Sequence, residues 1–589
     1  MAVSRDENSG GAWQGLAAAL WESGSFAEAE AAARKALELD AGLERASLIA
    51  GFALGRQRRF REASIHFGTV VQKHPRSVAG WQNLGGVLAS LGENERAELC
   101  YRRALEIDPS ASQVRIELAN ILSLLAKDDE ARAELQAAAP GASAGAALRC
   151  AQTISPMPES TAQILAEREQ FLNEIDRLSK ALRPIERLND GELATNFWLA
   201  YHGLNDRELQ EKWAGLVLKV CPWLGKSHVK PRRPASDRIR VGFISGFLKN
   251  AHTISKLTMG LMGTLPRERF EVIACDVSAS TDPGYLPKFA DRVLPCSLSP
   301  LEAQRQLADA ELDIAFFTDI GMSETTWQIA LGRVAPVQCT TWGHPVTSGF
   351  PSMDYFISSD LIEPEGAEAH YSEKLIRLST LPTYYYRPGR WTNKRPSLPP
   401  DWHVYLCPQS LFKFHPDFDY AFAEILRRDP AGRLLLIDLY GQFGNRLGDR
   451  IKAKFPDVID RVMFLNRMPT DELMGLMSTC HVMLDTHPFS GGNTSYEAFA
   501  FATPIVTLPA EYMRGRVTAG QYQKMGFTEC VASSTEDYIA KSVRLAADEE
   551  YRMWVRHQIA MHHDALYEDA AATTELASFF EQAHKEARG

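Results

Sequence analysis

Small and large apolar residues recur at fixed intervals in the first quarter of the chain. Four copies of a pattern with a period of about 34 residues run from residue 10 to residue 143. The third copy shows the pattern most clearly, at Trp81, Leu84, Gly85, Leu88, Gly92, Ala97, Tyr101, Ala104 and Pro109. Because small residues let two helices approach closely, each copy predicts a pair of antiparallel helices.

The period and the positions match the tetratricopeptide repeat, and such repeats stack into a superhelix with a concave groove. We expect the groove to dock a protein or a peptide. The alternatives are a spacer and a dimerisation arm, and a dimerisation arm would make the protein a homo-oligomer. Residues 144–235 have helical periodicity, with Trp198, Tyr201 and Trp213 at spacings that suit buried helix faces, and they predict a helical connector.

Beyond residue 235 the pattern changes to short apolar runs that alternate with helical segments. The runs predict strands in two series, at residues 236–400 and 401–589. Alternating strands and helices predict one parallel, doubly wound, Rossmann-like sheet per series, with ligands beyond the carboxyl ends of the strands. We expect a terminal helix at 573–587, as part of the second lobe. The predicted strands are 239–245, 270–277, 312–319, 337–342 and 353–358, then 404–407, 434–438, 462–465, 481–484 and 504–508.

A glycine-rich turn in the second series carries the clearest candidate chemistry. The stretch from Asp485 to Glu497 reads DTHPFSGGNTSYE and lies between a predicted strand and a predicted helix. Gly491 and Gly492 let the backbone approach a ligand closely, because they lack a Cβ atom. Asn493, Thr494 and Ser495 follow at the first helical turn, where free backbone N–H groups favour an anion. An ordinary capped helix after a turn is the alternative.

Other polar side chains also fall just beyond predicted strands. Lys413 follows the strand 404–407 and can offset the charge of a departing diphosphate, although most lysines lie on the surface. The pair Arg514 and Arg516 follows the strand 504–508 and is a second candidate for a phosphate contact. In the first series the corresponding candidates are His252, Asp319 and His344. A histidine in such a loop is either a general base or an ordinary structural residue.

Composition and charge exclude several classes of protein. A chain of 589 residues exceeds one hydrophobic core, and a net charge of −10 argues against general binding to nucleic acid or to an anionic membrane. Nine scattered cysteines without a C-x-x-C pair predict neither a disulfide framework nor a structural zinc site. The sequence shows no secretory signal and no membrane-spanning run, so we expect a cytoplasmic protein.

Two Rossmann-like lobes with an anion site in the second one resemble the GT-B fold of nucleotide-sugar glycosyltransferases. With the repeats in front, the chain resembles glycosyltransferase family 41, which includes O-GlcNAc transferases, SPINDLY-type proteins and bacterial relatives. The resemblance covers nearly the whole chain. Its motifs are VGFISGFLKNAHT (241–253), APVQCTTWGHPVTSGFPSMDY (335–355), HYSEKL (370–375), QSLFKFHP (409–416), LDTHPFSGGNTS (484–495), TPIVTLP (503–509) and RVTA (516–519).

The resemblance implies a role for each candidate. On the donor side, it implies a diphosphate contact for Lys413 and a ribose contact for Glu497, and it places the base near the backbone of Arg467 and Met468. On the sugar and acceptor side, it implies His252. Asp319 and His344 are further candidates for that side because they also lie at predicted strand ends. The remaining donor-binding candidates are Gln409, Gly491, Gly492, Asn493, Thr494 and Ser495.

The glycine turn departs from the pattern of the O-GlcNAc transferases. Those proteins have GHTT where this chain has GGNT, so Gly492 stands where His is expected, and Glu497 stands where Asp is usual. The turn is more similar to that of the adhesin N-glucosyltransferases of the same family. Some bacterial relatives with this layout modify flagellin with a nonulosonic acid, which requires a CMP-linked donor.

The leading hypothesis is an inverting protein glycosyltransferase that uses a nucleotide sugar, preferably a UDP-sugar, and an acceptor protein docked by the repeats. No Asp-x-Asp motif stands at a strand end, so we expect no metal and no cofactor besides the donor. His252, the donor phosphate or a water chain are the candidate proton acceptors. The alternatives are transfer from a CMP-nonulosonic acid to flagellin and a catalytically silent scaffold.

Overall fold

The computed structural model describes residues 8–57, 59–125, 127–138, 143–188, 192–230, 238–249, 252–278, 282–389, 398–439, 441 and 443–588. The chain forms two compact units. The first comprises Met1–Thr153 with Leu188–Leu193, and the second comprises Ile154–Arg187 with Ala194–Gly589.

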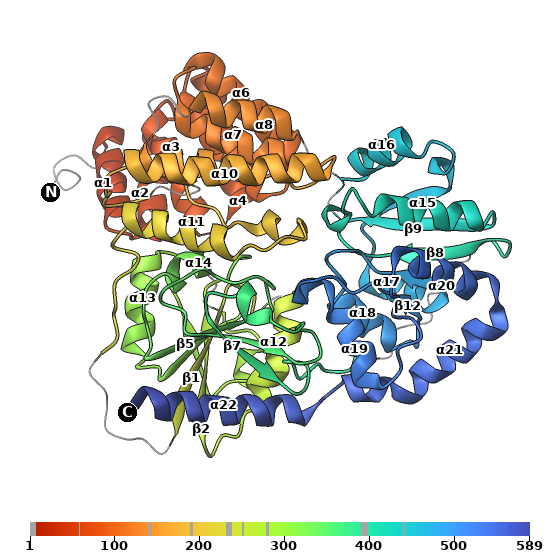
Figure 1. Cartoon of the computed structure of the whole chain (residues 1–589). Coiled ribbons are helices and arrows are strands. Elements are labelled where there is room, and N and C mark those ends of the chain that lie inside the picture. The colour runs from red at the N-terminus through yellow and green to blue at the C-terminus, as the bar shows by residue number, and fades with distance from the viewer. Residues whose placement is uncertain are drawn as a thin grey trace. The chain divides into compact units, whose positions relative to one another are not determined.

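The described part of the first unit is a stack of helix pairs (Figure 1). The first helix of each pair starts 34 residues after the previous one, which confirms the predicted repeats. Glycines allow the close approach within pairs: a Cβ atom on Gly85 would lie 2.9 Å from the Tyr101 ring. The pairs are α1 (Gly10–Glu22) with α2 (Phe26–Leu39), α3 (Glu44–Arg56) with α4 (Phe60–Lys73), α5 (Val78–Ser90) with α6 (Asn94–Ile107) and α7 (Ser112–Leu124) with α8 (Asp128–Ala138), followed by α9 (Ala144–Ala151).

The first lobe of the second unit is built on a parallel sheet with the strand order β3-β2-β1-β4-β5-β6-β7. Two of these strands, β3 and β7, were not predicted, because their sequences RVLP and KLIRL carry charges and are only partly buried. The main helices beside the sheet are α12 (Thr253–Thr264), α13 (Pro300–Asp309) and α14 (Glu324–Ala330). The strands are β1 (Ile239–Ser245), β2 (Phe270–Asp276), β3 (Arg292–Pro295), β4 (Ile314–Phe317), β5 (Val337–Thr341), β6 (Tyr355–Ser359) and β7 (Lys374–Leu378).

The second lobe contains a parallel sheet with the order β10-β9-β8-β11-β12. Both lobes therefore have the predicted doubly wound topology. The strands are β8 (His403–Cys407), β9 (Gly432–Asp438), β10 (Val462–Asn466), β11 (Val482–Leu484) and β12 (Ile505–Val506). The α-helices are α15 (Asp419–Arg428), α16 (Gly444–Lys454), α17 (Thr470–Thr479), α18 (Asn493–Phe499), α19 (Val517–Met525), α20 (Thr535–Ala547) and α21 (Glu549–His562).

The terminal helix α22 (Ala570–Arg588) lies against the sheet of the first lobe, not in the second lobe as predicted (Figure 1). Its Phe580 is fully buried, with ring centroids 6.3 Å from Phe270 and 5.8 Å from Phe316. Sequence periodicity identifies an amphipathic helix but does not identify the sheet that its apolar face will cover.

Much of the predicted connector belongs to the second unit. Helix α10 (Thr161–Ala181), the short 3-10 helix η1 (Phe197–Tyr201) and helix α11 (Arg207–Val220) are all part of it. Trp213 is fully buried, and its ring lies 5.3 Å from that of Phe171 on α10. The apolar spacing noted in the sequence therefore marks packing within this unit.

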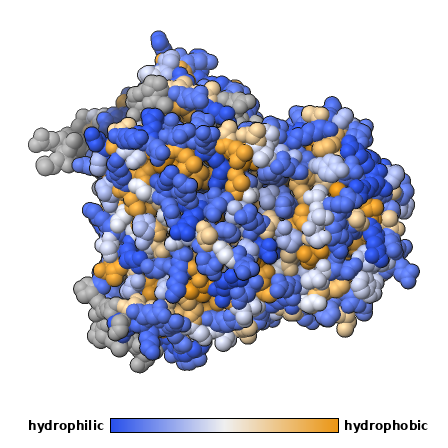
Figure 2. Space-filling model, viewed as in Figure 1, coloured by the Kyte–Doolittle hydropathy of each residue, from blue (hydrophilic) through white to orange (hydrophobic). Residues whose placement is uncertain are grey.

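Polar side chains cover most of the face shown in Figure 2, with apolar residues in small groups between them. In the described ranges, no helix combines the length and the apolar character needed to cross a membrane.

Candidate active site

A cavity of about 290 Å³ lies where the two lobes meet, close to the lower end of the range for small-molecule sites, about 300–1,000 Å³. In each sheet the first strand, β1 or β8, lies between its second strand and its fourth, β4 or β11. Ligands bind beyond the carboxyl ends of the strands at such a reversal of strand order. The predicted residues that line the cavity are His252, His344, Gln409, Lys413, Gly491, Gly492, Asn493 and Thr494.

Lys413 reaches the cavity from the loop after β8. Its Nζ donates to Gln409 Oε1 at 2.8 Å and lies 3.4 Å from the Ser490 carbonyl oxygen and 4.6 Å from the centroid of the Phe489 ring. Burial lowers the pKa of Lys413 to about 8, although the nearby Asp485 opposes the shift. A cation that protein atoms desolvate but only partly compensate is well suited to an anionic ligand.

The buried Asp485 fixes the glycine turn. This buried carboxylate accepts hydrogen bonds from the Gly491 backbone N–H at 2.6 Å and from Thr507 Oγ1 at 2.8 Å. Any side chain at position 491 would force its neighbours to shift, since a Cβ atom there would lie 2.5 Å from Ser495 Oγ and 2.7 Å from Gln409 Nε2. At Gly492 a Cβ atom would meet nothing nearer than Val517 Cγ1 at 4.0 Å, so the departure from GHTT leaves open space at the cavity.

Helix α18 starts at Asn493, as the sequence predicts, and presents two polar side chains to the cavity. Gln409 Nε2 donates to Thr494 Oγ1 at 2.7 Å, which links the turn to the Lys413 loop. Both amide atoms of Asn493 are buried and lack a hydrogen-bond partner among the described residues. Buried polar atoms usually have partners, so this amide marks a position that a ligand can complete.

Ser495 and Glu497 do not line the cavity. Ser495 Oγ lies 2.9 Å from Thr518 Oγ1 in the interior of the second lobe. Glu497 is 7% exposed, and its Oε1 lies 2.5 Å from Nζ of Lys256 on α12, across the lobe boundary. The implied ribose contact would require Glu497 to share or exchange this partner.

The two predicted histidines line the cavity in different environments. His344 is buried, stacks on Phe197 with ring centroids 5.3 Å apart, and has a pKa lowered to about 3 by burial and by Arg514. It therefore stays neutral at pH 7. His252 caps α12, with its Nδ1 accepting from the Ile254 backbone N–H at 3.3 Å, and burial also lowers its pKa. In the neutral ring, His252 Nε2 then carries the hydrogen and can donate to a ligand.

Asp319 is fully buried and does not line the cavity. Its Oδ2 accepts from the Gly246 backbone N–H at 2.9 Å and from Ser245 Oγ at 3.0 Å, and burial raises its pKa to about 7. Asp319 thus holds the backbone directly after β1, at Gly246, and the structure does not bring it to the sugar side. Arg467 and Met468 follow β10, and neither is among the residues that line the cavity.

Sequence reasoning missed an aromatic wall of the cavity, formed by Phe197, Tyr201, Phe412 and Phe489. The Tyr201 ring lies 4.9 Å from that of Phe412 and 4.7 Å from that of Phe489. Phe197 and Tyr201 come from η1 in the predicted connector, where the spacing of Tyr201 indicated only a buried helix face and Phe197 was not singled out. No periodicity within that segment reveals that it borders a site built by distant strands.

Arg514 also lines the cavity, as its position after β12 suggested. It is 4% exposed, and its guanidinium contacts Asp206 Oδ2 at 3.1 Å. In the part of the chain that the structure covers, no group of three or more His, Cys, Asp or Glu side chains is arranged to hold a metal ion.

The model of the glycosyl transferase family 41 matches residues 205–386 and 391–574, which together exceed half of the chain. The chain belongs to glycosyl transferase family 41. Models of the tetratricopeptide repeat also match residues 10–42 and 78–111. Both matches confirm the resemblance recognised in the sequence.

The chain is similar to relatives named as probable UDP-N-acetylglucosamine–peptide N-acetylglucosaminyltransferases, with about a quarter of the aligned residues identical. A probable UDP-N-acetylglucosamine–peptide N-acetylglucosaminyltransferase SEC from Arabidopsis thaliana is 25% identical over 54% of this chain and 34% of its own length. A probable enzyme of the same description, SPINDLY from the same plant, is 27% identical over 37% of this chain and 24% of its own length. The matches thus span about a third or less of these relatives.

A solved structure supports the fold over nearly the whole chain. A mutant O-GlcNAc transferase from Thermobaculum terrenum superposes with a TM-score of 0.69, and the superposition covers 93% of this chain and 98% of that one. The two sequences are 22% identical. At this identity the likeness establishes the repeat-plus-GT-B architecture.

Proposed function

We propose that the protein is a glycosyltransferase that moves a sugar from a nucleotide sugar to a side chain of an acceptor protein. The observation that carries the proposal is the partly buried Lys413 beside the glycine turn, at a cavity between two Rossmann-like lobes. Membership of family 41 supports the same conclusion. The repeats of the first unit are the proposed docking surface for the acceptor protein.

The reaction that fits this geometry is a displacement at the anomeric carbon. The acceptor atom forms a bond to that carbon while the bond to the leaving phosphate oxygen breaks, and the acceptor proton passes to a base. Lys413 and the N–H groups at the start of α18 stabilise the charge that develops on the leaving group, so the step needs no metal ion. We expect inversion at the anomeric carbon, because in a single displacement the acceptor attacks from the side opposite the leaving group.

The state of His252 bears on the choice of the base. Because its Nδ1 faces the Ile254 backbone N–H, the neutral ring donates from Nε2 and does not accept there. His344 has a pKa of about 3 and is too weak a base at neutral pH. These two states favour the donor phosphate or a bound water as the proton acceptor, with His252 as a hydrogen-bond donor to the substrate.

We favour a UDP-sugar as the donor, because the matched relatives are named as probable UDP-N-acetylglucosamine-dependent enzymes. A CMP-linked nonulosonic acid, with flagellin as the acceptor, is the second candidate. The observation that favours it is the open space beside Gly492 at the cavity.

The test is a thermal-shift titration of the full chain with UDP, GDP and CMP, in parallel with the variants Lys413→Ala and Lys452→Ala. Lys452 lies exposed on α16 and serves as the matched control. A ligand that binds only the folded state raises the unfolding midpoint, so the nucleotide identifies itself without a known acceptor. We expect a shift with UDP that disappears in Lys413→Ala and persists in Lys452→Ala.

A shift with CMP alone would make the CMP-linked nonulosonic acid, and not a UDP-sugar, the proposed donor. A shift with none of the three nucleotides would reject the transferase proposal in favour of a catalytically silent scaffold.

A further inference from the structure

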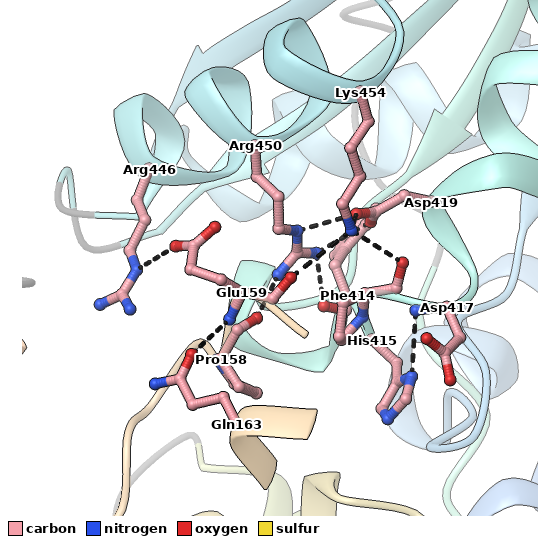
Figure 3. Close-up of polar contacts among 11 residues, drawn as sticks. Pro158, Glu159, Gln163, Phe414, His415, Asp417, Asp419, Arg446, Arg450 and Lys454 are labelled. Atoms are coloured by element: carbon pink, nitrogen blue, oxygen red, sulfur yellow. Dashed lines mark hydrogen bonds and ion pairs between the residues drawn. The ribbon is translucent and has the colours of Figure 1, made fainter. Parts of the chain in front are cut away.

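A buried arginine on α16 ties together three segments of the second unit (Figure 3). The Arg450 side chain is 1% exposed, and so is that of Asp419, the first residue of α15. Arg450 Nε and Nη2 donate to the two oxygens of Asp419, both at 2.8 Å. The fork of the guanidinium matches the carboxylate, so the pair has a defined geometry.

Arg450 also donates hydrogen bonds to backbone carbonyls of two other segments. Nη2 also donates to the Phe414 carbonyl oxygen at 2.7 Å, and Nη1 donates to the Pro158 carbonyl oxygen at 2.9 Å. Phe414 directly follows Lys413 in the chain. One guanidinium therefore holds the carbonyl next to the proposed diphosphate contact.

The loop that carries Lys413 has little regular structure of its own. Only the single turn of 3-10 helix η4 (Leu411–Lys413) precedes Phe414, and α15 does not start until Asp419. Lys454, one turn after Arg450 on α16, adds a contact of 3.3 Å to the Pro416 carbonyl oxygen. Two side chains of α16 thus contact the backbone that follows Lys413.

The same helix face also binds the segment that leads into α10. Arg446 donates to Glu159 Oε1 at 3.1 Å, and Glu159 is in turn fixed by a hydrogen bond from its backbone N–H to Gln163 Oε1 at 2.9 Å. Thr161 Oγ1 donates to Asp417 Oδ2 at 2.6 Å in the Lys413 loop. The segment 155–163 and the Lys413 loop therefore share one polar junction.

We propose that Arg450 is a positioning residue for Lys413: by fixing the Phe414 carbonyl against Asp419 and Pro158, it sets where the Lys413 ammonium lies in the cavity. Its importance for turnover rests on the proposed function, since it acts only through Lys413. The geometry itself is independent of the identity of the donor.

The experiment measures the reactivity of each lysine in the full chain as a function of pH, by trace labelling with acetic anhydride and mass spectrometry. It requires no donor and no acceptor. The first variant is Arg450→Lys, which keeps a positive charge beside Asp419 but loses the fork. The second, Arg450→Met with Asp419→Asn, removes the buried charges together, because an unpaired buried carboxylate can unfold the lobe. The control is Arg446→Lys, one turn earlier on the same helix.

In the wild type, we expect a labelling midpoint for Lys413 near 8, because burial lowers its pKa and the opposing effects of Asp485 and Cys407 are smaller. If Arg450 positions the loop, its variants let water reach the ammonium, and the midpoint rises by about one pH unit or more. The labelling midpoint of the exposed Lys452 should be the same in every variant. In the Arg446→Lys variant, the midpoint of Lys413 should stay at its wild-type value.

A Lys413 midpoint that stays unchanged in folded Arg450 variants would overturn the proposal. Variants that raise the labelling of all lysines together would overturn it too, because Arg450 would then stabilise the fold of the whole lobe and not the position of one loop. A midpoint that moves in a protein that binds none of the three nucleotides would retain the positioning role and reject the proposed function.

Discussion

Replacing Lys413 by methionine should make the protein more stable while it abolishes nucleotide binding. The pKa of Lys413 is about 8 in the folded protein, compared with an ordinary value of 10.5. The difference corresponds to a cost of at most about 3 kcal/mol for keeping the ammonium charged at pH 7. Methionine fills a similar volume without this cost, but it loses the hydrogen bond to Gln409, worth about 1 kcal/mol. We therefore expect a net gain of about 1–2 kcal/mol at pH 7.

The gain should depend on pH in a defined direction. Since the folded-state pKa is below the unfolded-state value, the unfolded chain binds more protons between about pH 8 and 10.5, and the stability of the wild type rises across that window. The Lys413→Met variant lacks this group, so its advantage should be full below pH 8 and shrink as the pH rises towards 10.5. Urea unfolding of the second unit at pH 7 and pH 9.5 measures both differences, with Lys452→Met as the control.

Two results would refute this reasoning. One is a Lys413→Met variant that is less stable than the wild type at pH 7, which would mean that the protein compensates the ammonium fully. The other is an advantage that stays constant between pH 7 and pH 9.5, because a difference without pH dependence cannot come from the Lys413 charge.

Three further predictions concern the glycine turn, the aromatic wall and the repeats. Gly491→Ala should abolish the thermal shift with nucleotide, because its Cβ would lie 2.5 Å from a side-chain oxygen. Gly492→Ala should retain the shift, because its Cβ would meet nothing nearer than 4.0 Å. Equal thermal shifts in the two variants would contradict this account of the turn. Phe197→Ala should raise the pKa of His344 from about 3 towards its ordinary 6.5, since it uncovers the stacked ring, and an NMR titration that leaves the His344 signal unchanged would exclude this. Glu98→Gln should destabilise the first unit by about 1–2 kcal/mol in a circular-dichroism melt, because Glu98 is 7% exposed and accepts hydrogen bonds from a lysine and an arginine. Nucleotide binding should stay intact. A melting curve equal to that of a variant at the exposed Glu95 would argue against this prediction.

Local patterns were sufficient to predict the elements that form from short stretches of sequence. The repeats follow from the spacing of small residues such as Gly85, which packs on Tyr101 within one helix pair. The strand–turn–helix from Val482 to Phe499 follows from an apolar run, two glycines and a polar first turn. In both cases the deciding contacts lie close together in the chain, so the sequence pattern and the structure carry the same information.

Contacts between distant segments could not be predicted in this way. The sequence placed Asp319 at a strand end beside His252, but it does not show that the carboxylate turns away from the cavity to hold Gly246. It placed Glu497 one turn beyond the glycines, but not opposite Lys256 of the other lobe. These outcomes depend on the side-chain directions and on the juxtaposition of two sheets, and neither leaves a periodic signal.

The costly features of the second unit converge on one place, and this convergence argues for function more strongly than any single residue. Lys413 keeps a desolvated charge, Asn493 leaves both amide atoms without a partner among the described residues, and His344 remains a neutral ring in a buried stack. Each arrangement lowers stability relative to an apolar or fully bonded alternative. All three side chains line the same cavity. A scaffold would gain nothing from such a cluster, whereas a site that binds a charged, hydroxyl-rich ligand recovers the cost on binding.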